Sequence, residues 1–186
     1  MSLIAALRDF VGIFDRLALP YAVMGGLAVR VYGIPRPTQD VDFTVAVARE
    51  RLGEVYQAAM SLGYTVAEPY LAGWVDRVAG MPVVKLRRYI GERGVDVDLF
   101  LAECRFQQEM LARRRTALID GVTVSMVSPE DLVLLKLLAG RPRDIADITD
   151  VLFTQGRLDE VYLRSWAGQI GVLDALKDIL ASPPGI

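Results

Sequence analysis

Two segments of the chain alternate strictly between apolar and polar residues, and both carry aspartates on the polar side. In Asp40 to Val47 the apolar positions are Val, Phe, Val and Val, and the polar positions begin with two aspartates. Val95 to Ala102 repeats this design around Asp96 and Asp98. Because successive side chains of a strand point to opposite faces, each segment is predicted to be a half-buried strand that presents two carboxylates on one face.

The remaining apolar patterns predict helices and further strands, mixed along the chain. Helices are expected at residues 2–17, 27–32, 49–62, 103–115, 132–139 and within 143–180, and strands at 21–24, 82–89 and in a hairpin turning at Asp120-Gly121. A turn at Gly91-Glu92-Arg93-Gly94 is expected to join the strands at 82–89 and 95–102. The Ser182-Pro183-Pro184-Gly185 tail is expected to be disordered, and residues 64–80 are harder to interpret.

Composition excludes several classes of site. The 186 residues include no histidine, which excludes Ser-His-Asp and Cys-His hydrolases and metals held by imidazole. The single cysteine, Cys104, excludes a disulfide framework and a multi-thiolate zinc site, and it fits the reducing cytoplasm, where we expect the protein to be located. No signal peptide and no apolar stretch of about 20 residues is recognised, so no membrane partner is expected. The chemistry must then use carboxylates, hydroxyls, Lys or Arg, or a metal held by oxygen ligands.

The charge balance gives no indication of a general attraction to nucleic acid, because the formal net charge is −2. The run Arg113-Arg114-Arg115 is interpreted as a solvated helix end rather than an RNA-binding patch. Cys104, Trp74 and Trp166 are interpreted as packing residues.

A glycine pair and an aspartate pair form the strongest functional signal. Gly25-Gly26 lies between a predicted strand and a predicted helix, and thirteen residues separate it from Asp40. Asp40 and Asp42 share a strand face with α-carbons about 6.6 Å apart, so their carboxylates can converge on one site. A cluster with a third carboxylate would need a cation, and Mg²⁺ prefers such oxygen ligands. The glycine pair would leave backbone N–H groups open to phosphates beside a helix N-terminus.

Each of these features has a simpler interpretation when taken alone. An isolated Asp-x-Asp is most often a turn residue followed by a solvated one, and Gly-Gly is often a tight turn. Here the glycine turn, the strand with carboxylates on one face, and a second such strand at Asp96 and Asp98 occur together. That coincidence favours a phosphate and metal site.

Two groups of motifs resemble a known family. The segment Gly25-Gly26-Leu27-Ala28, followed by Thr38-Gln39-Asp40-Val41-Asp42-Phe43, resembles the nucleotidyltransferase superfamily, whose members have a DNA polymerase beta-like fold. The segments Ser128-Pro129-Glu130-Asp131-Leu132, Lys136 and Arg141-Pro142-Arg143-Asp144-Ile145-Ala146-Asp147 resemble its AbiEii-type, MNT-like branch, which includes toxins of toxin–antitoxin pairs. The resemblance covers residues 20–155.

The resemblance implies roles for the acidic residues and the glycines. Asp40 and Asp42 match the metal-binding pair of the superfamily, and a third carboxylate on a neighbouring strand helps to activate the attacking hydroxyl. Asp98 is preferred as the third, because it precedes the usual apolar pair, and Asp96 on the same face is the close alternative. Two Mg²⁺ ions are implied at these carboxylates. Gly25-Gly26 would hold the triphosphate of the substrate NTP.

Three further residues are expected near the nucleotide. Lys136 lies in an otherwise apolar helix, where a lysine usually reaches the surface, and within the resemblance it would contact a nucleotide phosphate. Arg143 and Asp147, with Asp144, either line the nucleotide cleft or form an ion-pair network that holds two helices together.

The implied fold is α/β (α+β), a small mixed sheet flanked by helices, with residues 1–127 as the catalytic core and 128–186 as a C-terminal helical region packed on it. The implied reaction moves a nucleoside monophosphate from an NTP to an acceptor hydroxyl on RNA such as tRNA, a protein or a small molecule. A toxin-type role with a cognate antitoxin protein is one expectation. The alternative is a non-catalytic MNT-like module that binds nucleotide or protein in such a pair.

Overall fold

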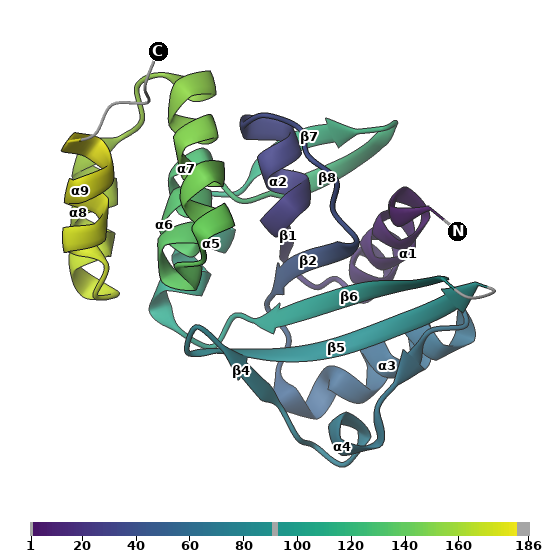
Figure 1. Ribbon diagram of the computed structural model, residues 1–186. Coiled ribbons are helices and arrows are strands. Elements are labelled where there is room, and N and C mark those ends of the chain that lie inside the picture. Colours follow the sequence, from purple (N-terminus) through teal and green to yellow (C-terminus); the bar gives the residue numbers. More distant parts are fainter. Residues whose placement is uncertain (1, 91–92, 182–186) are drawn as a thin grey trace.

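The protein folds around one mixed β-sheet, seen in a computed structural model that describes residues 2–90 and 93–181 (Figure 1). Among these residues the strands hydrogen-bond in the order β3-β5-β6-β2-β1-β8-β7, and β4 pairs with β5. The strands are β1 (Tyr21–Met24), β2 (Asp40–Val45), β3 (Thr65–Val66), β4 (Asp76–Val78), β5 (Met81–Ile90), β6 (Arg93–Leu101), β7 (Arg115–Ile119) and β8 (Val122–Met126). A mixed sheet with flanking helices is the expected fold class, which is therefore confirmed.

Helices cover the sheet and continue beyond its last strand. They are α1 (Leu3–Arg16), α2 (Gly25–Tyr32), the 3-10 turn η1 (Arg49–Arg51), α3 (Leu52–Ser61), α4 (Glu68–Leu71), α5 (Arg105–Ala112), α6 (Pro129–Ala139), α7 (Pro142–Gln155), α8 (Glu160–Gln169) and α9 (Leu173–Ala181). Figure 1 shows α6 to α9 gathered at one end of the sheet, next to α2. None of the described helices is long and apolar enough to cross a membrane.

The two strands predicted from alternating residues lie side by side and parallel. The pairing of β2 with β6 places Asp40 beside Asp96 and Asp42 beside Asp98. Their apolar face is buried except at Val95, which is partly exposed, and Phe43 of β2 packs edge-on against Phe14 of α1, with ring centroids 5.1 Å apart. Burial of this face therefore determines that all four aspartates lie on the other side of the sheet.

Local sequence signals explain several element boundaries. The Ser128 hydroxyl accepts a hydrogen bond from the Asp131 amide at 3.2 Å, so α6 begins as its N-cap predicted. Asp120 and Gly121 both adopt positive φ, 44° and 79°, which is the geometry of the expected two-residue hairpin turn between β7 and β8. The glycine turn differs from expectation, since α2 starts at Gly25 rather than two residues later.

Other expectations need correction. The helix predicted at 103–115 spans only 105–112, and Arg115 belongs to β7. Residues 64–80 form β3, α4 and β4 along one edge of the sheet. Cys104 is exposed and Trp74 is 62% exposed, so neither packs as expected, whereas Trp166 is buried beside Phe106. Gly91 and Glu92 of the expected turn and the tail at 182–185 lie outside the described residues.

Candidate active site

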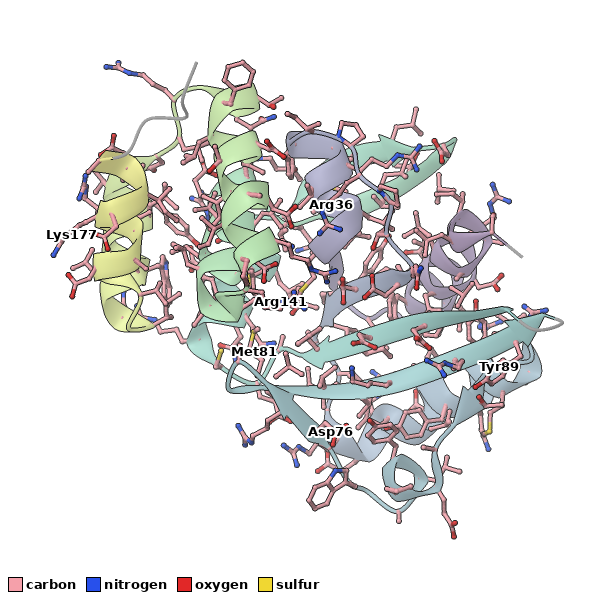
Figure 2. All side chains as sticks on the ribbon, in the orientation of Figure 1. Arg36, Asp76, Met81, Tyr89, Arg141 and Lys177 are labelled. Atoms are coloured by element: carbon pink, nitrogen blue, oxygen red, sulfur yellow. The ribbon has the colours of Figure 1, made fainter. Side chains whose placement is uncertain are left out.

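A cavity of about 270 Å³ lies where β2, β6, α2 and the C-terminal helices meet. We call it the glycine cavity; its lining residues are Gly25, Gly26, Arg36, Thr38, Asp40, Asp42, Val78, Lys85, Asp98, Phe100, Lys136, Arg141 and Arg143. Of the predicted site residues, Asp147 and its companion Asp144 are absent from this lining, as is Asp96, the alternative third carboxylate. Figure 2 shows Arg36 and Arg141 on the side of the molecule where α7 approaches the strands. The cavity therefore combines the predicted carboxylates and glycines with a group of basic residues.

Asp42 is the carboxylate of the cavity whose surroundings most disfavour its negative charge. Burial, together with the negative charges of Asp40 and Asp98, raises its pKa to about 7. Burial also raises the pKa of Asp98. A site that disfavours its own negative charges in this way gains stability when a cation enters it.

Asp40 and Asp98 each have a partner within the protein. The Thr38 hydroxyl donates a hydrogen bond to Asp40 at 2.7 Å, and the Lys85 ammonium donates one to Asp98 at 2.9 Å. Among residues 2–90 and 93–181, no three acidic, thiol or imidazole side chains form a ready-made metal-binding group. The ligands on offer are all carboxylate oxygens, which suit Mg²⁺, but some of them must change partners to bind it.

The two candidates for the third carboxylate have different surroundings. Asp98, which pairs with Asp42, lines the glycine cavity. Asp96 lies two residues earlier on β6, pairs with Asp40 and does not line this cavity. The guanidinium of Arg87 pairs with both oxygens of Asp96, one of them at 2.6 Å, and this ion pair lowers the Asp96 pKa. The structure thus brings Asp98, rather than Asp96, next to Asp42.

The two glycines are required for different steric reasons. Gly25 has φ +63°, and a Cβ there would lie 1.9 Å from a carboxylate oxygen of Asp42. A Cβ on Gly26 would lie 2.4 Å from the Thr38 hydroxyl. Because neither glycine carries a Cβ, the first turn of α2 can approach Asp42 and Thr38 closely. Its free N–H groups can then face an anion in the cavity.

We expect Gly25→Ala to weaken nucleotide binding at least about tenfold, because alanine is strained at this φ and its methyl group would displace Asp42. Gly73→Ala is a matched control, since Gly73 also has a positive φ, 92°, but has nothing within 4 Å of an added Cβ. Calorimetric titration with a non-hydrolysable NTP would measure both variants. Equal affinities would show that Gly25 forms only a turn.

Lys136 is not at the surface, contrary to the usual expectation for a lysine in an apolar helix. Its side chain is 7% exposed, and its ammonium donates to Asp144 at 2.9 Å and to Asp147 at 2.6 Å. Helices α2, α7 and α8 all pack against α6, which accounts for the low exposure of Lys136. The lysine also lines the glycine cavity, so its ion pairs with Asp144 and Asp147 do not separate it from a ligand that would occupy the cavity.

An ion-pair network joins α6 to α7, which is one of the two interpretations proposed. It contains Asp144 and Asp147, but their cationic partners are Lys136, Arg36 and Arg141 in place of the expected Arg143. Arg36 forms two hydrogen bonds to Asp147, at 2.7 and 2.8 Å, and Arg141 pairs with Asp144 at 2.6 Å. Burial raises the pKa of both carboxylates, but their hydrogen bonds to Lys136 and the arginines outweigh it and lower both. Arg143 instead lines the cavity.

We expect Lys136→Met to lower the free energy of unfolding by about 3 kcal/mol, because it leaves two buried carboxylates without their shared cation. Lys177→Met should change it by less than about 0.5 kcal/mol, since the pair of Lys177 with Asp174 is exposed. Urea unfolding would compare the two. Equal losses would mean that Lys136 has no structural role.

Six residues of the cavity were not among the predicted site residues: the polar Arg36, Thr38, Lys85 and Arg141 and the apolar Val78 and Phe100. Arg36 and Thr38 lie in the proline-containing loop just before Asp40, so proximity in sequence could have suggested them. Lys85 carries no such signal, because only the pairing of β5 with β6 brings it to Asp98.

The fold resembles solved nucleotidyltransferases. ANT(2")-Ia in complex with adenylyl-2"-tobramycin matches with a TM-score of 0.57 and 19% identity, over 96% of this chain and 98% of that chain. An antigenic nucleotidyltransferase-like protein from Paracoccidioides brasiliensis matches with a TM-score of 0.55 and 21% identity, over 99% and 94%. The lincomycin-bound lincosamide antibiotic adenylyltransferase LnuA matches with a TM-score of 0.51 and 16% identity, over 78% and 93%.

A search of the curated proteins finds no significant match. The family model described as "Nucleotidyl transferase of unknown function" (DUF2204) matches residues 6–170, which is most of the chain. With the carboxylates, the glycine turn and the fold in agreement, the chain belongs to this nucleotidyltransferase family.

Proposed function

We propose that the protein transfers a nucleoside monophosphate from an NTP to an acceptor hydroxyl and releases pyrophosphate. The observation that carries the proposal is the glycine cavity. It brings three carboxylates, a glycine turn at a helix N-terminus and several basic side chains to one place, and the Asp42 pKa is raised to about 7. Family membership supports a transferase in general.

Two adjacent groups of residues in the cavity suit the metal ion and the triphosphate of the substrate. Asp40, Asp42 and Asp98 would hold Mg²⁺, and this metal would supply charge neutralisation for the attacking and leaving oxygens. The α2 N-terminus at Gly25-Gly26, together with Arg143, would bind the triphosphate. The predicted phosphate contact of Lys136 and the predicted place of Asp147 in the nucleotide site stay predictions.

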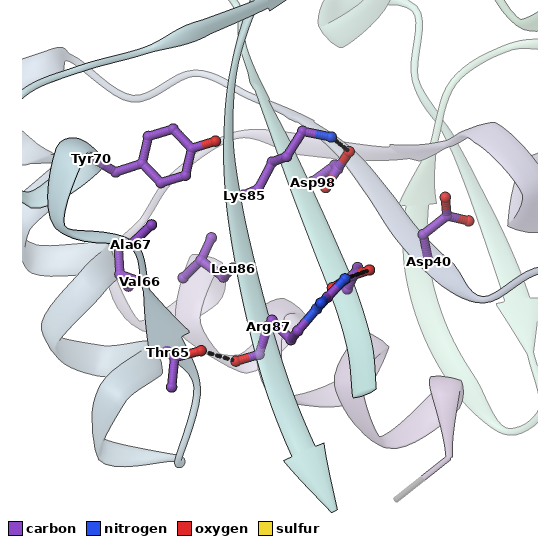
Figure 3. Close-up of a pocket in the computed structure, with 10 residues that line it drawn as sticks. Asp40, Thr65, Val66, Ala67, Tyr70, Lys85, Leu86, Arg87 and Asp98 are labelled. Carbon is purple, nitrogen blue, oxygen red and sulfur yellow. Dashed lines mark hydrogen bonds and ion pairs between the residues drawn. The ribbon is translucent and has the colours of Figure 1, made fainter. Parts of the chain in front are cut away.

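A second cavity, of about 450 Å³, adjoins the first and would receive the acceptor. We call it the strand cavity; it is lined by Asp40, Thr65, Val66, Ala67, Tyr70, Lys85, Leu86, Arg87, Asp96 and Asp98 (Figure 3). Asp40, Lys85 and Asp98 line both cavities. An acceptor in the strand cavity would therefore meet the nucleotide at Asp98.

Asp98 is proposed to take the proton of the acceptor hydroxyl. The hydroxyl oxygen would then form a bond to the α-phosphorus, while the bond from that phosphorus to the bridging oxygen breaks and pyrophosphate leaves. The carboxylate lies at the junction of the two cavities, as a general base for this attack must.

A small-molecule acceptor is favoured over RNA. The volume of the strand cavity lies within the range of small-molecule sites. The Arg113–Arg115 run does not offer a free basic patch, because the Arg113 guanidinium stacks 3.7 Å over the Tyr162 ring and lies near Glu130. Two of the structural neighbours are described with an adenylylated aminoglycoside or a lincosamide, which supports the same class of acceptor.

The narrower expectations stay predictions. These are the AbiEii-type branch, a toxin role with an antitoxin partner, the non-catalytic alternative, a protein acceptor, and a cytoplasmic location. The proposed division into 1–127 and 128–186 is supported by the position of every described strand before residue 127.

The test is to incubate the protein with each labelled NTP and Mg²⁺ or EDTA, and with tobramycin, lincomycin, total tRNA or no acceptor. Transfer of label to a small molecule with release of pyrophosphate, abolished by EDTA and by Asp42→Asn, would support the proposal. Transfer to tRNA would keep the reaction and change the acceptor. Nucleotide binding without transfer to any acceptor would favour the non-catalytic module.

A further inference from the structure

Lys85 lies at the boundary between the two cavities. It faces Asp98 across the antiparallel β5–β6 pair, and its ammonium lies 2.9 Å from a carboxylate oxygen of Asp98 (Figure 3). The Lys85 side chain is 47% exposed, whereas that of Asp98 is 14% exposed. The lysine can therefore move more freely than the carboxylate that it holds.

The neighbouring pair on the same strands has a different design. Two residues along, Arg87 grips both oxygens of Asp96 with its guanidinium and also contacts the Tyr89 hydroxyl at 3.2 Å. Only three of the 21 basic residues of the chain are lysines, so an ammonium at position 85 departs from its general use of arginine. An ammonium is a compact, mobile charge that does not form the bidentate pair of hydrogen bonds that a guanidinium forms with a carboxylate. It can therefore be displaced from Asp98 more easily than an arginine could.

A metal ion and Lys85 must compete for Asp98. The described residues contain no ready-made metal group, and Asp98 already shares one oxygen with the lysine. A cation that binds between Asp42 and Asp98, through either oxygen of Asp98, would lie close to the ammonium and be repelled by it.

We propose that Lys85 is a positioning residue that holds Asp98 in the metal-free protein, and that metal binding displaces its ammonium into the strand cavity, where it faces the acceptor. The inference rests on the proposed function, because it takes Asp98 as a metal ligand. Lys85 then couples the two cavities: the strand cavity gains an unpaired hydrogen-bond donor only after the metal has bound. An acceptor oxygen next to the reacting hydroxyl would receive that hydrogen bond.

The first test is titration of the folded protein with Mn²⁺, followed by electron paramagnetic resonance in the absence of nucleotide. We expect Lys85→Met to tighten Mn²⁺ binding about tenfold, the effect of removing one unit charge about 6 Å from a divalent ion in a solvated site. Lys85→Arg keeps the charge and can hold Asp98 with two hydrogen bonds, so it should bind Mn²⁺ no more tightly than the unmodified protein does. Arg87→Met removes the neighbouring cation and should change the affinity less than about threefold. Unchanged or weaker binding in Lys85→Met would overturn the inference.

The second test follows the lysine itself. Brief acetylation with an amine-specific reagent, read by mass spectrometry, would compare Lys85 with and without saturating Mg²⁺. We expect labelling of Lys85 to rise severalfold with Mg²⁺, because the ammonium loses its carboxylate partner. Lys177 is the internal control, since it forms an ion pair of the same 2.9 Å length with Asp174 on α9, and its labelling should not change. Constant labelling of both lysines would overturn the proposed displacement.

The two proposals fail in different ways. Absence of Mn²⁺ binding, or binding that survives Asp42→Asn, would overturn the metal site of the proposed function and this inference with it. Mn²⁺ binding that is lost in Asp42→Asn but does not respond to Lys85→Met would overturn only the role of Lys85.

Discussion

Asp42→Asn is expected to reduce nucleotidyl transfer at least about 10³-fold while the protein stays folded. The substitution removes the central negative charge of the three carboxylates, and a metal clamp in such a site is worth several kcal/mol of transition-state stabilisation. The side chain faces the glycine cavity, on the side of β2 opposite Phe43 and the apolar core, so the core is not disturbed. Steady-state rates with Mg²⁺ and circular dichroism would measure both effects.

The same variant should be more stable than the unmodified protein when no metal is present. The Asp42 pKa is raised from 3.8 to about 7 in the folded state, so the folded protein binds this proton more tightly than the unfolded chain does. The free energy of unfolding of the unmodified protein therefore falls as pH rises from about 4 to about 7. Above pH 7 the whole cost of the buried Asp42 charge remains. Asparagine carries no such penalty. We expect an advantage of up to about 4 kcal/mol at pH 8 that disappears near pH 4.

Two controls separate this effect from a general one. Asp15→Asn, on the exposed side of α1, should change stability by less than about 0.5 kcal/mol at either pH. Saturating Mg²⁺ at pH 8 should stabilise the unmodified protein and not Asp42→Asn. A variant with an unchanged transfer rate would remove Asp42 from the proposed machinery.

Asp98→Ala should lower kcat at least about 10²-fold, whereas Asp96→Ala should leave kcat within about threefold of the unmodified value. Asp98 stands at the junction of the two cavities, whereas Asp96 is held by Arg87 on the wall of the strand cavity alone. The half-exposed Lys85 can hydrate when its partner is lost, so Asp98→Ala should remain folded. Rates at saturating NTP and acceptor would measure kcat directly. The reverse order of the two variants would identify Asp96 as the third carboxylate.

Much of the fold followed from patterns within single segments. Alternation in 40–47 and 95–102 predicted both half-buried strands, because burial of one face requires a period of two. Ser128 predicted the start of α6 and Asp120-Gly121 predicted the hairpin, because capping and turn geometry involve only a few consecutive residues. These signals are local, so no knowledge of distant contacts was needed.

Burial of single side chains was harder to predict. Trp74 and Cys104 were expected to pack and are exposed. A lysine in an apolar helix usually reaches the surface, and Lys136, for which a phosphate contact was expected, is buried. Residue type gives only an average tendency, since exposure depends on which other elements cover a position. For Lys136 those elements are three helices that pack around α6.

The sequence by itself determined which residue types were available: carboxylates alternating on two strands, a glycine pair before a helix, and no histidine or second cysteine. Only the tertiary structure decided how they meet. The parallel register of β2 and β6 places Asp98 beside Asp42, and β5 brings Lys85 to Asp98. The ion pair of Arg36 with Asp147 links the loop before β2 to α7. These contacts join residues far apart in the chain, and they form because burying the apolar faces of the sheet and helices selects one register and one packing.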